Sequence, residues 1–149
     1  MATSSAIDTN ISTLPAADQA RTDIETTGTT TTITVTGAPL SGLEATTSSE
    51  APNLVLNGSF RESTFTGGGT FKEFFSVTSG NKVISSRFNL GEDNFKDTLN
   101  FGNKASAKKV TVSDFGDNDK LKYKGKTYTA DDIVGNRFVG ISKNQIKLA

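Results

Sequence analysis

The sequence predicts an all-β protein: a small sandwich or roll of short antiparallel strands, preceded by an extended N-terminal arm. Three observations lead to this prediction. Short segments alternate apolar and polar residues, which is the period of a half-buried strand. Turn-forming Gly, Asn and Asp residues separate these segments about every 8–12 residues, a spacing typical of all-β domains. The aromatic residues are confined to one part of the chain, because all ten Phe and both Tyr follow residue 52.

The most regular pattern lies between Leu90 and Gly125. Two acidic loops, GEDNFKD and GDNDK, each precede a short alternating segment, DTLNF and DKLKY. Asp97 and Asp119 occupy equivalent places in the two units, 22 residues apart. Apolar residues two positions apart share one face of a strand. The pattern therefore predicts strand, acidic turn and strand, with Phe101 among the core residues.

The rest of residues 53–149 is also expected to consist of short strands separated by turns. The expected strands are 54–56, 59–65, 71–77, 82–90, 109–113, 126–128, 138–141 and 145–148. Residues 129–134 fit one helical turn with capping-box spacing. The glycine run at 66–70 is expected to join two strands as a hairpin, since no Gly-Lys-Ser/Thr follows it, as a phosphate loop would require.

Residues 1–52 differ from the remainder in composition. They hold six acidic residues and one basic residue, whereas residues 53–149 hold ten acidic and fifteen basic residues. Ser and Thr make up 20 of the first 50 residues. Such a segment buries too little apolar surface to fold alone. The sequence therefore predicts two parts: a docking arm, residues 1–52, that becomes ordered on a partner, and a β-rich body, residues 53–149.

A tract of β-branched residues, 29–36, is the expected point of contact within the arm. This tract is predicted to form a strand with a small apolar face. Such a strand is suited to pair with the edge strand of a sheet in another protein. The residues expected to dock the arm on its partner are Ile7, Ile11, Leu14, Ile24, Ile33 and Val35.

The composition argues against several classes of function. The chain has no His, the usual general base, and no Cys for thiolate chemistry or disulfides. Acidic and basic residues balance at 16 each, so no overall charge attracts nucleic acid or an anionic membrane. No apolar run is long enough to span a bilayer, and the N-terminus lacks the pattern of a Sec signal peptide. We expect neither catalysis, nucleic-acid binding nor membrane insertion.

Four carboxylates remain as candidates for a metal site. Asp97, Asp114, Asp117 and Asp119 lie in oxygen-rich, glycine-containing loops, which suit a hard cation such as Ca²⁺. The alternative is that Asp, Asn and Gly serve the tight turns themselves. A second pair, Glu62 and Glu73, flanks the glycine run and admits a third, carbohydrate-active or carbohydrate-binding, interpretation.

The central stretch resembles the repeats-in-toxin (RTX, haemolysin-type) proteins. The segment VSDFGDNDKL, residues 112–121, is similar to the close of their repeat array, and GEDNFKDTLNF, residues 91–101, is similar to a degraded Gly/Asp repeat. The resemblance implies that the four aspartates line Ca²⁺ turns. It also implies a small secreted, extracellular protein that is exported by a type I route and folds on Ca²⁺.

The overall layout resembles the capsid decoration proteins of tailed phages, cyanophages included. Those proteins combine an ordered arm with a projecting, Cys-free β domain. This resemblance implies a virion location and a capsid or tail protein as the partner. The leading expectation is a non-enzymatic decoration or attachment protein, and the secreted RTX-like protein is the alternative.

Overall fold

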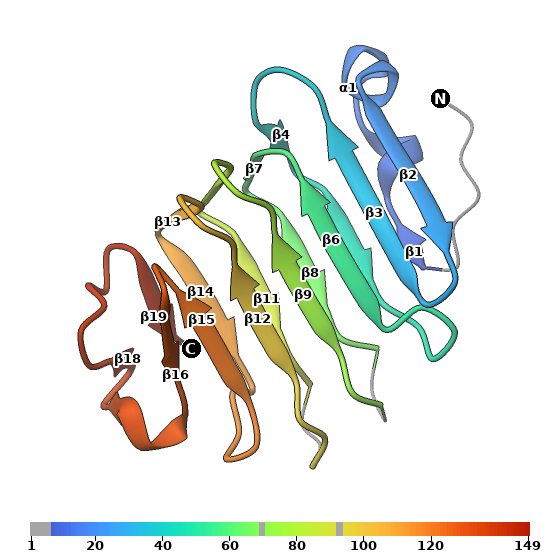
Figure 1. The fold of residues 1–149 in the computed structure, drawn as a ribbon. Helices are drawn as coiled ribbons and strands as arrows, with labels where there is room; N and C mark the ends of the chain where they lie inside the picture. Colours follow the sequence, from blue (N-terminus) through green and yellow to red (C-terminus); the bar gives the residue numbers. More distant parts are fainter. Residues whose placement is uncertain (1–6, 69–70, 92–93) are drawn as a thin grey trace.

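The computed structural model describes residues 7–68, 71–91 and 94–149, which wind into a β-solenoid (Figure 1). Strand accounts for 46% of the structure and helix for 8%, which confirms the all-β prediction. The arrangement differs from the expected antiparallel sandwich or roll, because most strands pair in parallel with the strand one coil further along the chain. Within the coils, the turn between two strands changes the direction of the chain at a corner, and hairpins occur only toward the ends of the described chain, at residues 22–35, 120–128 and 133–138.

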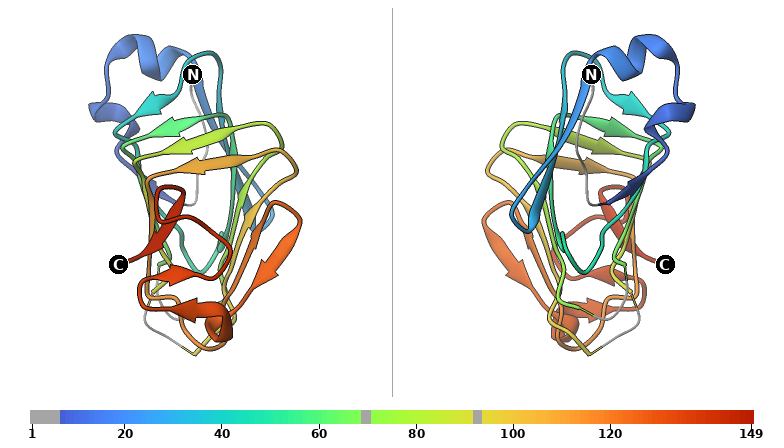
Figure 2. Two further views of the ribbon diagram at one scale, coloured as in Figure 1. Left: turned by 90° about the vertical axis from the view of Figure 1, so that its left-hand side faces the viewer. Right: turned by 90° about the vertical axis from the view of Figure 1, so that its right-hand side faces the viewer.

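Each full coil contributes one strand to each of three sheets, which surround a common interior (Figure 2). The seven-stranded sheet has the order β16 (Lys126–Tyr128), β15 (Lys120–Tyr123), β12 (Thr98–Phe101), β9 (Phe74–Val77), β6 (Asn53–Asn57), β3 (Thr30–Val35) and β2 (Thr22–Thr27). The four-stranded sheet has the order β13 (Ser106–Lys108), β10 (Lys82–Ile84), β7 (Phe60–Arg61) and β4 (Leu40–Ser41). The six-stranded sheet has the order β1 (Asp8–Thr9), β5 (Glu44–Thr46), β8 (Thr64–Thr66), β11 (Arg87–Asn89), β14 (Val110–Ser113) and β19 (Ile146–Leu148).

Short elements complete the two ends of the solenoid. They are η1 (Ile11–Thr13), α1 (Ala16–Ala20), η2 (Ala130–Asp132) and the hairpin of β17 (Ile133–Val134) and β18 (Arg137–Phe138). Thr129 and Asp132 form the predicted capping box at η2. No helix in the part of the chain that the structure describes is long and apolar enough to cross a membrane.

The coils repeat in register along the seven-stranded sheet. Its inward positions stack as Thr31, Leu54, Phe75, Leu99 and Leu121, which are 21 to 24 residues apart. The spacing of Asp97 and Asp119 in the sequence is therefore one step of a repeat that runs through most of the chain. Solenoids are built in this way, each repeat burying its apolar face on its neighbours.

Aromatic rings fill the interior as a connected column. Phe88 lies at its centre, with ring centroids 5.1 Å from Phe65, 6.0 Å from Phe75 and 6.1 Å from Phe101. Phe101 continues the column to Tyr123 at 5.3 Å. Phe101 is 3% exposed, so its predicted place in the core is confirmed. These contacts tie successive coils together through offset and edge-to-face ring geometry.

The corner between the four-stranded and six-stranded sheets uses one backbone conformation in every coil. Gly42, Glu62, Ser85 and Lys109 follow β4, β7, β10 and β13, with φ of 77°, 49°, 48° and 56°. This left-handed conformation costs little for glycine and more for other residues. The repeated turn redirects the chain from one sheet to the next.

Residues 22–46 form the first coil and do not extend as a separate arm. β3 pairs along five residues with β6, so the fold continues across the expected boundary at residue 52. The first coil contains few apolar residues, but its inward side chains pack on those of the second coil. Its many threonines fit strands well because they are β-branched and because their hydroxyls satisfy one another, as Thr26 and Thr31 do at 2.8 Å.

The chain closes both ends of its own core. At the N-terminal end, β2 turns back antiparallel to β3 and buries Ile24. At the C-terminal end, Phe138 is buried with its ring centroid 5.0 Å from that of Phe115 and 5.8 Å from that of Tyr128. Such caps cover the apolar interior that an uncapped solenoid would expose.

Candidate functional site

Three buried carboxylates occupy one corner of the solenoid. Glu73, Asp97 and Asp119 directly precede β9, β12 and β15, so they hold equivalent positions in three successive coils. Their exposed fractions are 0%, 1% and 4%. We call this set the carboxylate ladder. It combines two aspartates of the predicted Ca²⁺ set with one glutamate of the predicted carbohydrate pair.

The carboxylate ladder bonds each coil to its neighbour through backbone amides. Asp119 Oδ1 accepts a hydrogen bond from the Asp97 N–H at 3.0 Å, and Asp97 Oδ1 accepts one from the Glu73 N–H at 2.7 Å. Asp119 Oδ2 also accepts from the Gly116 N–H at 2.7 Å, which closes its own turn. A buried N–H that is left without an acceptor destabilises the fold, and each of these carboxyl oxygens supplies such an acceptor. The ladder therefore stabilises the stacking of coils at this corner.

Replacement of Asp97 by Ala is expected to lower the free energy of unfolding by about 1.5–3 kcal/mol, because it leaves the buried Glu73 N–H without its acceptor. Asp97→Asn should lose less, since an amide oxygen can still accept. Chemical denaturation followed by circular dichroism would measure both. The matched control is Asp117→Ala, at an exposed position in the next loop. Equal unfolding midpoints for Asp97→Ala and this control would contradict the structural role of the ladder.

The structure divides the predicted Ca²⁺ set into two kinds of position. Asp97 and Asp119 are buried, whereas Asp114 and Asp117 are exposed. Within residues 7–68, 71–91 and 94–149, no three acidic residues form a group that could hold a metal ion. Glu92 and Asp93 of the earlier acidic loop lie outside the described residues. Ca²⁺ binding stays a prediction. The alternative, that these aspartates serve the tight turns themselves, is supported at Asp119 by the hydrogen bond that it accepts from the Gly116 N–H.

The predicted glutamate pair lies at two different corners. Glu62 is exposed, in the left-handed turn between β7 and β8, while Glu73 is buried next to β9. The strands on either side of the glycine run, β8 and β9, belong to the six-stranded and the seven-stranded sheet and do not pair as a hairpin; Gly69 and Thr70 of the run lie outside the described residues. Glu62 and Glu73 therefore do not face each other across the glycine run, as a pair of catalytic carboxylates would have to do.

The six residues predicted to dock on a partner belong to the core of this chain. Ile24, Ile33, Val35 and Ile7 are 2%, 0%, 7% and 8% exposed. Ile11 and Leu14 are partly buried and pack against the same core. The apolar side chains were identified correctly, but they are covered by neighbouring coils. β3 also has a partner on each side, β2 and β6, so it offers no free edge for an added strand.

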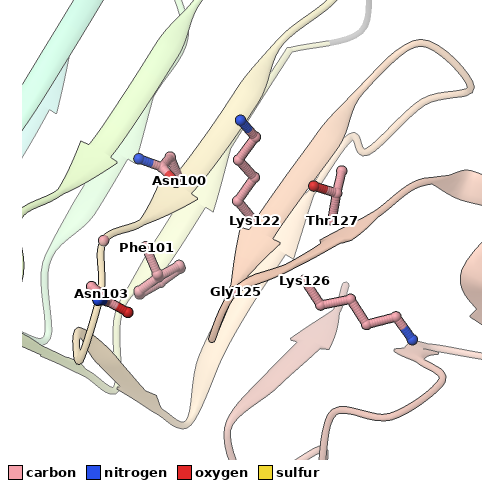
Figure 3. Close-up of a pocket in the computed structure, with 8 residues that line it drawn as sticks. Asn100, Phe101, Asn103, Lys122, Gly125, Lys126 and Thr127 are labelled. Atoms are coloured by element: carbon pink, nitrogen blue, oxygen red, sulfur yellow. The ribbon is translucent and has the colours of Figure 1, made fainter.

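The outer surface offers shallow depressions. One of about 400 Å³ lies at the C-terminal end of the seven-stranded sheet and includes Asn100, Lys122, Lys126 and Thr127 in its lining. Figure 3 shows the side chains of Lys122 and Lys126 pointing in different directions, so their ammonium groups do not converge on one point. This depression is part of a basic surface and has no enclosed binding site.

Charge is distributed along the axis of the solenoid. A depression at the N-terminal end of the same sheet is lined by Asp23, Glu25 and three threonines from β2 and β3. The opposite end carries four exposed lysines, Lys120, Lys122, Lys124 and Lys126. The difference in composition seen in the sequence thus becomes a difference between an acidic and a basic end.

The fold and the ladder together define a capped β-solenoid module. Comparison with known proteins finds no matching family model, no matching curated protein and no matching solved structure.

Two sets of residues that hold the coils together were missed by sequence reasoning. Glu73 was not connected with Asp97 and Asp119, although all three stand immediately before an alternating segment. At the next corner, Ser63 Oγ accepts from the Leu43 N–H at 3.2 Å and Ser86 Oγ accepts from the Ser63 N–H at 3.1 Å. A search for polar residues recurring every 20 to 24 residues would have found the Glu73, Asp97 and Asp119 series.

Proposed function

We propose that this chain is a non-enzymatic structural protein, a virion decoration or attachment protein whose solenoid serves as a short rigid rod. The observation that supports this most directly is that the buried acidic side chains bind the backbone of the neighbouring coil. Asp97 and Asp119 hold adjacent coils together by accepting backbone hydrogen bonds, so they serve the scaffold. The outer faces of the rod are left for contact with other structural proteins.

The surfaces available for such contact differ from those expected from the sequence. The side chains at Ile33 and Val35 are inside the fold, so docking through them is not part of the proposal. The outer faces of the sheets and the charged side chains at the ends of the rod are the alternatives.

A secreted Ca²⁺-dependent protein is the second candidate, favoured by one specific observation. Asp97 and Asp119 recur at the same corner of successive parallel coils, and parallel coils with a recurring aspartate are the architecture of RTX repeats. The backbone hydrogen bonds of both carboxylates weigh against it.

Fractionation of material from the natural source would separate the two candidates. The proposal expects peptides of this chain in gradient-purified virus particles, at a constant ratio to the major shell protein. It also expects the same melting temperature in Ca²⁺ and in EGTA for the purified chain. Recovery from particle-free culture fluid, with a melting temperature that rises on adding Ca²⁺, would favour the secreted candidate instead, because a ligand that binds only the folded state stabilises it.

A further inference from the structure

The corner between the four-stranded and six-stranded sheets carries a cluster of positive charge, which we call the basic corner. Its four basic residues come from β7, β11, β13 and the turn after β13, and they are Arg61, Arg87, Lys108 and Lys109. All four side chains are exposed, and none of them forms an ion pair with another residue in the described part of the chain. The cluster is therefore available to attract an anion from solution.

The parallel register places these residues on one stretch of the outer surface. Arg87 on β11 is in register with Thr64 on β8 and Thr111 on β14, and all three point outward, since the next residue of each strand is buried. On the other side of the corner, Arg61 and Lys108 are in register with the same residue of β10. Adjacent strands lie about 4.8 Å apart, so the backbones of Arg61 and Lys108 are separated by about 10 Å. The basic corner thus crosses three successive coils.

A depression of about 400 Å³ lies at this corner. Its lining combines two of the charges, Arg87 and Lys109, with hydroxyl side chains from each of the three coils. Thr64, Ser85 and Thr111 supply one such hydroxyl each, and all three residues are exposed or partly exposed. A hydroxyl both donates and accepts hydrogen bonds. The depression therefore offers positive charge beside groups that can bind the hydroxyls of a sugar.

From these features we propose that the basic corner binds an anionic polysaccharide. Arg87 and Lys109 hold its carboxylate or sulfate groups, and the hydroxyls of the three coils bind its sugar hydroxyls. The guanidinium of Arg87 suits such a group because it can donate two parallel hydrogen bonds to one acidic group. The inference rests on the proposed attachment role and identifies the chemistry of what the protein attaches to.

Two features favour a polysaccharide over a nucleic acid. Glu62 also lines the depression and would repel DNA, which carries a negative charge about every 1.7 Å along its axis. The acidic groups of a polysaccharide are separated by uncharged parts, whose hydroxyls can donate a hydrogen bond to Glu62. The exposed aromatic rings of the described residues, Phe74 and Phe95, lie in β9 and just before β12 of the seven-stranded sheet, so they are not placed to stack on bases at this corner.

Isothermal titration calorimetry of the purified full-length chain tests the proposal with four probes: dextran sulfate, polygalacturonate, uncharged dextran and a DNA duplex. We expect dextran sulfate, polygalacturonate or both to bind, and the one that binds identifies the acidic group. Dextran should not bind, and the duplex should bind more weakly than the better of the two charged polysaccharides. The proposal would be overturned if neither charged polysaccharide bound, if dextran bound as tightly as dextran sulfate, or if the duplex bound as tightly as the polysaccharides.

Removal of charge locates the surface. Arg87→Gln/Lys109→Gln should weaken binding of the charged polysaccharide by about tenfold or more, the loss expected when hydrogen bonds to charged groups are removed. Both side chains are exposed, so this variant should keep the melting temperature of the unchanged chain. The control Lys120→Gln/Lys122→Gln removes the same charge from the outer face of the seven-stranded sheet and should bind like the unchanged chain. An equal loss in the two variants, or no loss in the first, would overturn the inference.

This inference and the proposed function fail separately. A chain that binds no polysaccharide can still be recovered from virus particles, and the proposed structural function would then stand with a different partner. Absence of the chain from virus particles would remove the proposed function even where calorimetry shows binding to the polysaccharide.

Discussion

Replacing Ile33 by lysine is expected to destabilise the whole chain by about 4 kcal/mol or more, the range reached when an unpaired charge is buried. Ile33 is 0% exposed and lies in β3 between β2 and β6. Thermal unfolding followed by circular dichroism should show one transition at a much lower temperature, or no folded chain. The loss is global because the first coil packs directly on the second.

Thr32→Lys provides the matched control for the Ile33 variant. Its side chain lies on the outer face of the same strand and is partly exposed, so a lysine there can reach water. We expect a change of less than about 1 kcal/mol, as at other surface positions. If residues 1–52 were an independent arm, neither variant would change the melting of the body. A normal melting curve for Ile33→Lys would therefore contradict the first coil as described.

Replacing Phe88 by alanine is expected to cost about 3–5 kcal/mol, the usual range for removing a buried phenylalanine ring. Phe88 is 0% exposed and contacts three other rings, from Phe65, Phe75 and Phe101. Its removal would leave a cavity that rigid sheets on three sides cannot fill. Chemical denaturation would give the free-energy difference, and Phe88→Leu should lose less because it fills more of the space.

The control for Phe88 is Phe74→Ala in the same coil. The Phe74 side chain points away from the core of the seven-stranded sheet and is 37% exposed. Its removal should cost less than about 1 kcal/mol. Similar losses for the two alanine variants would indicate that the inward and outward faces have been assigned wrongly, which a shift in register by one residue would produce.

The sequence located most strands of the body, but the expected strands 59–65 and 82–90 are each divided by a corner, and residues 139–141 do not form a strand. Alternation fixes which side chains share a face, so Leu99, Phe101 and Leu121 were placed correctly in the core. It does not say which strands are neighbours. A short turn with Gly or Asn is compatible with a hairpin and with a corner of a solenoid. The left-handed turns at Glu62, Ser85 and Lys109 use residues that give no special signal for that conformation.

The larger error was the prediction that residues 1–52 form a separate arm, and the reason for it is physical. Composition measures how much apolar surface a segment can bury by itself. A coil of a solenoid needs only half a core, because its neighbour supplies the other half. Thr31, Ile33 and Val35 suffice as the inward face of β3 since they pack against the second coil. The candidate site shows the same limit, because the roles of Asp97 and Asp119 depend on amides about one coil away in the chain.

The register of the coils also bears on how a protein of this kind changes in length. Successive coils pair through the same parallel backbone pattern, so duplication of one unit of 21 to 24 residues would keep that pattern and add one new side-chain interface, between the two copies of the unit. Adjacent strands lie about 4.8 Å apart, so each added unit would lengthen the rod by that distance. The two caps would be carried apart unchanged. The length of the solenoid and the residues at its two ends can therefore vary independently in evolution or by design.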